Sequence, residues 1–133
     1  MEHPGGALGI RIDYKGRSFV QASDIEPEGG HPPPELVALC RNADYLSYDS
    51  TYVEGEEYER HKGWGHSTWV VGLKIAEAAG VKTFIAFHHD PAHDDEFMDN
   101  IASELALARR GSLVAYEGMT IDLLTGTVTL YEP

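Results

Sequence analysis

The sequence predicts an α/β domain in which one mixed β-sheet carries helices packed on one face. Two observations predict this class: short apolar or alternating runs take turns with runs of helical period along the chain, and glycine, proline and polar residues separate them. Such alternation is typical of a sheet layered with helices. A length of 133 residues suits a single domain, residues 1–133, with one hydrophobic core.

The first part of the chain predicts a hairpin, a helix and a strand. Residues 7–14 and 17–23 form two short alternating or apolar runs, and Lys15-Gly16 between them is a strong hairpin signal. Pro34 is well placed as the first residue of a helix that continues through ELVALCRNA. The run DYLSYD, residues 44–49, then predicts a strand.

The rest of the chain continues the alternation. We expect an acidic, aromatic-rich loop over 50–65, a helix over 67–79 that Gly80 ends, and a buried strand over 81–87. A second long helix follows over 93–110, with acidic residues in its first turn and arginines near its end, as the helix dipole favours. The remaining residues predict a strand and a hairpin.

Composition limits the compartment and the partners. No apolar run reaches the length of a membrane span, and the first residues do not resemble a signal peptide. The single cysteine, Cys40, fits a reducing cytoplasm. The formal net charge of −12 should repel a phosphate backbone, so we expect nucleic acid to be an unlikely partner.

Several potential metal ligands fall where strands end. His3 and Asp24 lie at the open end of the predicted hairpin, His88 follows the buried strand, His66 precedes the helix that starts at Ser67, and Asp49 closes the strand before it. Strand ends are where α/β folds usually build sites. If these strands are neighbours, imidazoles and a carboxylate converge, a ligand set that suits Zn²⁺, Mn²⁺ or iron.

Each of these residues also has an interpretation without function. Asp24 can form a turn, and His66 can simply precede a capping Ser67. His88 is harder to dismiss, because an unpaired imidazole beside a buried strand is unfavourable. A frayed or solvated side chain is the ordinary expectation for four others: His3, His31, His61 and His93.

The order of the motifs resembles a known family. The segments that carry the resemblance are HPGGALGIRIDY, SFVQASD, YDSTY, GWGHSTW, LKIAEAAGVKTFIAFHHDP and HDDEFMDNI. Together they resemble the C-terminal half of metallo-β-lactamase-fold hydrolases, and most of all the phosphodiesterases related to the tRNA 3′-processing endonucleases. The resemblance covers nearly the whole chain and implies half of a four-layer αββα sandwich.

The resemblance also implies roles for individual residues. His3 and His88 resemble metal ligands, and Asp24 resembles the aspartate that bridges two metal ions. His66 resembles the histidine that contacts the scissile phosphate and assists the leaving group. Asp49 would orient His66. A further implied role, substrate binding beside His66, falls to Ser67.

The family's principal motif, His-x-His-x-Asp-His, does not occur in the sequence. We therefore expect Met1 to be an internal start, with the N-terminal half of the fold absent and the isolated chain inactive. The apolar face that this half would cover needs another partner, and a homodimer is one possibility.

The function that follows is metal-dependent hydrolysis of a small phosphodiester, similar to a cyclic nucleotide, by a hydroxide that two divalent ions, most simply Zn²⁺, activate. Two alternatives stay open: lactone or thioester hydrolysis at the same centre, and an inactive half-domain that only dimerises.

Overall fold

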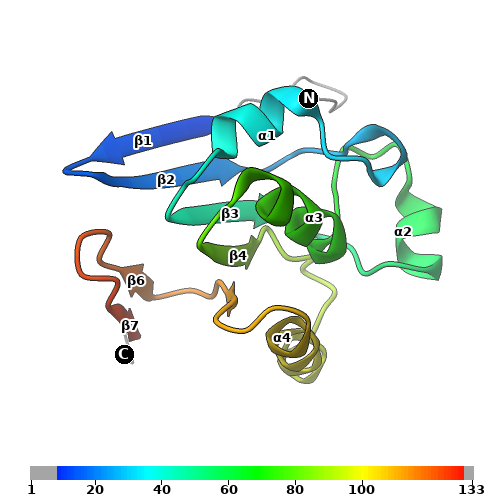
Figure 1. Cartoon of the computed structure of the whole chain (residues 1–133). Coiled ribbons are helices and arrows are strands. Elements are labelled where there is room, and N and C mark those ends of the chain that lie inside the picture. Colours follow the sequence, from blue (N-terminus) through cyan, green and yellow to red (C-terminus); the bar gives the residue numbers. More distant parts are fainter. Residues whose placement is uncertain (1–8, 131–133) are drawn as a thin grey trace.

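The computed structural model describes residues 9–130, and a five-stranded mixed sheet forms its centre (Figure 1). The strands lie in the order β1-β2-β3-β4-β5. Only β1 and β2 are antiparallel, while β2 to β5 run parallel. The strand bounds are β1 Ile10–Tyr14, β2 Arg17–Ala22, β3 Tyr45–Asp49, β4 Thr83–Phe87 and β5 Leu113–Val114. The predicted α/β class with a mixed sheet is confirmed.

The hairpin between β1 and β2 forms at the predicted turn. Tyr14 pairs with Arg17, so the loop has two residues. Both have positive φ, 48° at Lys15 and 77° at Gly16, as the tight turn of a two-residue hairpin requires. The register that follows places Ile10, Ile12 and Tyr14 on one face of the sheet.

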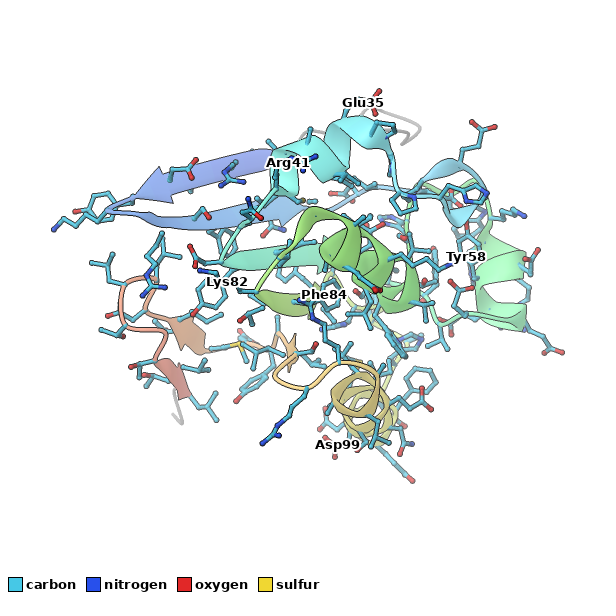
Figure 2. All side chains as sticks on the ribbon, in the orientation of Figure 1. Glu35, Arg41, Tyr58, Lys82, Phe84 and Asp99 are labelled. Carbon is cyan, nitrogen blue, oxygen red and sulfur yellow. The ribbon has the colours of Figure 1, made fainter. Side chains whose placement is uncertain are left out.

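Two helices cover the other face. α1 (Pro34–Cys40) and α3 (Trp69–Ala79) pack against each other, and α3 also packs on β3 and β4. Figure 2 shows Phe84 of β4 beneath α3. A Cβ atom on Gly72 would lie 2.6 Å from ring atoms of Phe84 and Tyr48, so this glycine allows α3 to approach the sheet. The largest fully buried apolar side chains of this core are Tyr48, Phe84, Ile25, Leu36, Leu46, Ile75, Leu105 and Val20.

Three details differ from the sequence prediction. The expected loop over 50–65 contains a short helix, α2 (Glu56–His61), whose first turn is acidic but which buries no residue and so lacks an apolar period. The cap of α3 is Thr68, whose side chain accepts a hydrogen bond from the Val71 amide, and not Ser67. The C-terminal hairpin, β6 (Met119–Ile121) and β7 (Val128–Leu130), forms a separate two-stranded sheet.

α4 (Asp95–Ala108) packs beside β5 at the edge of the sheet. Asp94 caps its first turn by accepting from the Phe97 amide. The helix ends two residues before the predicted Arg110, because Arg109 is extended and its guanidinium donates to the Val81 carbonyl.

The face of the sheet opposite α1 and α3 carries exposed apolar side chains. Ile10, Ile12 and Tyr14 of β1 are each about half exposed, and Phe87 of β4 is 39% exposed. In the part of the chain that the structure describes, no helix is long and apolar enough to cross a membrane.

Candidate metal and catalytic site

Four predicted site residues meet at one end of the sheet. Asp24, Asp49, His66 and His88 each offer a ligand atom, and these atoms all lie within 4.8 Å of one another. The strands β2, β3 and β4 point toward this end, where α2 also lies (Figure 1). Parallel strands bring their C-terminal ends to one edge, so residues distant in sequence become neighbours there. His3 lies outside the described residues.

His88 and Asp24 face each other with the geometry of two metal ligands. Nδ1 of His88 lies 2.9 Å from the Thr51 hydroxyl oxygen. That hydroxyl can donate to the His88 carbonyl or to Asp49, so it accepts from the imidazole, which leaves the lone pair of His88 on Nε2. Nε2 lies 3.4 Å from Oδ1 of Asp24.

This separation fits a divalent cation. Two ligands at about 2.1 Å from a tetrahedral Zn²⁺ lie about 3.4 Å apart. Both residues also have left-handed backbone, with φ of 56° at Asp24 and 62° at His88. Such conformations are unfavourable for residues with a Cβ and concentrate at functional sites. The donor pair therefore suits a divalent metal ion.

Asp49 belongs to the same group but is already saturated with hydrogen bonds. It is fully buried, and its Oδ1 accepts from the amides of Thr51 and Ser67, while the Thr51 hydroxyl proton is shared between this oxygen and the His88 carbonyl. Its Oδ2 accepts from the Ile25 amide at 3.3 Å and from Nδ1 of His66 at 2.9 Å. A carboxylate has about four lone-pair sites. Asp49 therefore positions its neighbours, and its lone pairs are committed to the protein.

The contact with Asp49 fixes the tautomer of His66. Nδ1 of His66 carries the proton that it donates to Asp49, so Nε2 is the atom that can give or take a proton in a reaction. The ring stacks on His88 with centroids 4.9 Å apart and is 18% exposed. His66 therefore lies directly beside the two potential metal ligands.

Ser67 does not share this exposure. It is 2% exposed, and its Oγ accepts a hydrogen bond of 2.8 Å from the Tyr48 hydroxyl. Desolvation raises the pKa of Tyr48, so this phenol stays a donor. The hydroxyl of Ser67 therefore faces Tyr48 in the core, and the expected role of this residue in substrate binding stays a prediction.

No sequence motif marks Glu26, yet it holds the loop that presents His66. Its carboxylate accepts from the amides of Gly63 and Gly65, at 2.9 and 3.0 Å, and from the Tyr58 hydroxyl at 3.0 Å. Figure 2 shows Tyr58 on α2. Burial, together with the negative charge of Glu26, raises the pKa of Tyr58 to about 12. Both glycines have φ near 90°, a conformation that few other residues adopt.

Replacing Glu26 with glutamine should loosen this loop. The amide group of glutamine would meet backbone N–H donors where a carboxylate oxygen now accepts, so we expect a loss of about 1–3 kcal/mol in unfolding free energy. Urea denaturation measures the loss. Glu28→Gln is the matched control, because Glu28 is exposed, and an equal stability of the two variants would contradict the anchoring role of Glu26.

Two histidines that were expected to be solvated instead make specific contacts with other side chains and with the backbone. The side chain of His93 is 5% exposed, and its Nε2 contacts both carboxylate oxygens of Glu57 at 2.9–3.0 Å. His61 donates from Nδ1 to the Glu57 carbonyl and stacks on Tyr52. His31 is exposed, as expected. Local sequence could not show the contact between His93 and Glu57, because these residues are 36 positions apart.

The sequence has relatives among the ribonucleases. It is 28% identical over 109 residues to ribonuclease Z of Myxococcus xanthus, a match that covers 81% of this chain and 33% of the relative. Ribonuclease Z of Porphyromonas gingivalis is 29% identical over 90 residues, which are 68% of this chain and 29% of the relative. The chain thus spans about a third of the length of the curated relatives it matches. No family model matches it.

The expectation that nucleic acid is an unlikely partner is wrong, because these relatives are named as ribonucleases. The error has a physical reason. Net charge is a property of the whole surface of one chain, and it does not report the local field at a site.

Solved structures show the same fold. The metallo-β-lactamase fold protein YhfI from Bacillus subtilis superposes with a TM-score of 0.68 at 19% identity, over 96% of this chain and 45% of that protein. The short form of human tRNase Z superposes with a TM-score of 0.60 at 21% identity, over 86% of this chain and 38% of that protein. The chain therefore has the fold of one part of a metallo-β-lactamase-fold protein, and it is related in sequence to the ribonuclease Z proteins.

Proposed function

We propose that this chain contributes part of a metal-dependent phosphodiesterase site that cleaves RNA. The observation that carries the proposal is the arrangement of His66: Asp49 orients it, and it stacks beside the His88–Asp24 pair. A group that can transfer a proton lies directly beside a pair that can bind a cation. Metal-dependent hydrolysis of a phosphodiester uses both.

Asp24 and His88 would hold a divalent metal ion, with Zn²⁺ the first candidate. When bound, such an ion polarises a phosphoryl oxygen and lowers the pKa of water toward neutrality. Thr51 supports this role, because it fixes the ring of His88 through Nδ1. His3 is a further proposed ligand. We infer that the remaining ligands come from a segment outside this chain, the N-terminal half of the fold.

His66 would protonate the departing oxygen. Water adds across the P–O bond, the proton on Nε2 of the imidazolium passes to the leaving oxygen, and the neutral ring regains a proton from solvent. Asp49 holds the ring in the required tautomer throughout. The first turn of α3 begins just after Thr68, and the positive end of this helix favours an anionic substrate nearby.

RNA is the proposed substrate because the relatives are ribonucleases and the structural neighbour is a tRNase. The acidic chain offers few phosphate contacts of its own, so a partner segment must supply most of the positive charge. A cytoplasmic location belongs to this proposal, since RNA and the reduced, buried Cys40 both fit it.

The test uses the native protein, purified from the source organism together with any polypeptide that is joined or bound to this chain. A tRNA transcript with a 3′ extension is incubated with Zn²⁺, Mn²⁺ or Fe²⁺, and cleavage and bound metal are measured. We expect His88→Ala to lower the metal content and to abolish cleavage. Asp24→Asn should act in the same direction, because it removes the anionic ligand.

His31→Ala is the control, because this histidine is exposed and outside the group of four. Equal metal content in the wild type and in a protein with both Asp24 and His88 replaced would reject the metal site. Bound metal without any cleavage of RNA would reject the substrate instead.

A further inference from the structure

Trp64 is a large exposed ring next to the candidate catalytic histidine. It is 60% exposed and lies two residues before His66. Two residues of extended chain span about 7 Å at most, so the indole starts from the immediate surroundings of the site. A single exposed aromatic residue is ordinary on a protein surface. The position and support of Trp64 are what distinguish it.

The backbone on both sides of Trp64 is fixed by one buried side chain. The amides of Gly63 and Gly65 both donate to Glu26, which is 9% exposed. The Trp64 amide itself donates to the His61 carbonyl at 3.0 Å. The loop therefore holds the backbone of Trp64 in place before any ligand arrives, which reduces the entropy lost on binding.

Contacting rings connect Trp64 to the site. Trp64 meets His61 edge to face with centroids 4.7 Å apart, and His61 stacks on Tyr52 at 4.4 Å. Tyr52 in turn meets His66 edge to face at 6.0 Å. Tyr52 is buried and Nδ1 of His61 is bonded to the Glu57 carbonyl, so both are supports. Trp64 is the exposed member of this series.

We propose that Trp64 is a stacking platform for a nucleobase next to the phosphate that is cleaved. This inference rests on the proposed RNA-cleaving function and adds a residue that selects a base-bearing substrate. A base fits this surface because the indole is uncharged and 60% exposed, whereas the exposed charges nearby in sequence have both signs, Glu54, Glu56 and Glu59 against Arg60 and Lys62. Stacking on an aromatic ring needs no positive charge and tolerates every base.

The first test is fluorescence. The chain has two tryptophans, so Trp69→Phe leaves Trp64 as the reporter. We expect a short single-stranded RNA to quench this signal, and a ribose-phosphate strand of the same length without bases to leave it unchanged. Equal quenching by both strands would overturn the proposal, since a contact with phosphate or sugar would then explain it.

The second test is kinetic and uses the active protein. Base stacking by one aromatic residue corresponds to roughly a 5- to 100-fold change in binding, so we expect Trp64→Ala to raise KM for RNA by that factor with little change in kcat. Trp64→Phe should restore most of the affinity. With an RNA that lacks the bases beside the cleaved bond, wild type and Trp64→Ala should behave alike.

Leu107→Ala on α4 is the matched control, because Leu107 is an exposed apolar residue far from this loop in sequence. An unchanged KM for Trp64→Ala, in a protein that still cleaves RNA, would overturn the stacking role and leave the proposed function standing. A protein that cleaves no RNA would reject the proposed function, and the fluorescence test would still decide whether Trp64 contacts a base.

Discussion

Replacing His66 with alanine will lower the turnover of RNA cleavage on the order of a hundredfold or more and will leave the metal content unchanged. The reason is that in the proposed mechanism His66 transfers the proton, whereas Asp24 and His88 bind the metal ion. Nδ1 of His66 donates to Asp49, so the ring acts through Nε2 and its tautomer is fixed by a residue outside the His88–Asp24 pair. Initial rates at saturating RNA and elemental analysis of the same samples measure the two quantities.

The side chain of His66 is only 18% exposed and donates to the buried Asp49, so its loss should also lower the unfolding free energy. A thermal melt of the variant excludes unfolding as the cause of a lower rate. His66→Gln is an informative companion, because it retains polar contacts but has no titratable proton. Turnover of either variant within a few-fold of the wild type would contradict proton transfer by His66.

Replacing Asp49 with asparagine should reduce both turnover and stability. Its carboxylate accepts from the amides of Ile25, Thr51 and Ser67 as well as from His66. An amide side chain has one acceptor oxygen, so a donor would meet a donor inside the protein, which costs about 1–3 kcal/mol. The imidazole would also lose the partner that fixes its tautomer, so we expect turnover to fall nearly as far as in His66→Ala.

Asp44→Asn is a matched control for this second effect. Asp44 is also buried, accepts from the Ser18 amide at 2.8 Å, and lies just before the opposite end of β3. Both variants should unfold at lower urea concentration, but only Asp49→Asn should lose turnover in the folded protein. Additivity of Asp49→Asn and His66→Ala in a double variant would show that the two residues act independently, against the positioning role.

The sequence predicted the sheet, and also the convergence of the site residues, because both depended on strong local patterns. The Lys15-Gly16 turn, the helix start at Pro34 and the end at Gly80 all lie where local chemistry placed them. Strand ends then brought Asp24 and His88 together. Their side-chain roles stay predictions, as does the role of His3.

What escaped the sequence depends on contacts between distant residues. Glu26 holds amides 37 and 39 residues later, and His93 reaches back to Glu57. Glu26 lies outside every quoted segment, and although His93 opens the segment HDDEFMDNI, nothing in that segment indicates its partner. The inward side chain of Ser67 was missed for a related reason: its neighbour Thr68 took the capping position that either residue can fill.

The exposed edge of β1 affects the solubility of the purified protein. Among the described residues 9–130 this strand is the outermost of its sheet and pairs with β2, and its Ile10, Ile12 and Tyr14 are about half exposed. An edge strand with exposed apolar side chains can pair with a strand of another molecule, which is a frequent route to precipitation. The exposed edge of β1 should therefore limit the solubility of the purified polypeptide, and concentrated samples will need a partner or additive that covers this edge.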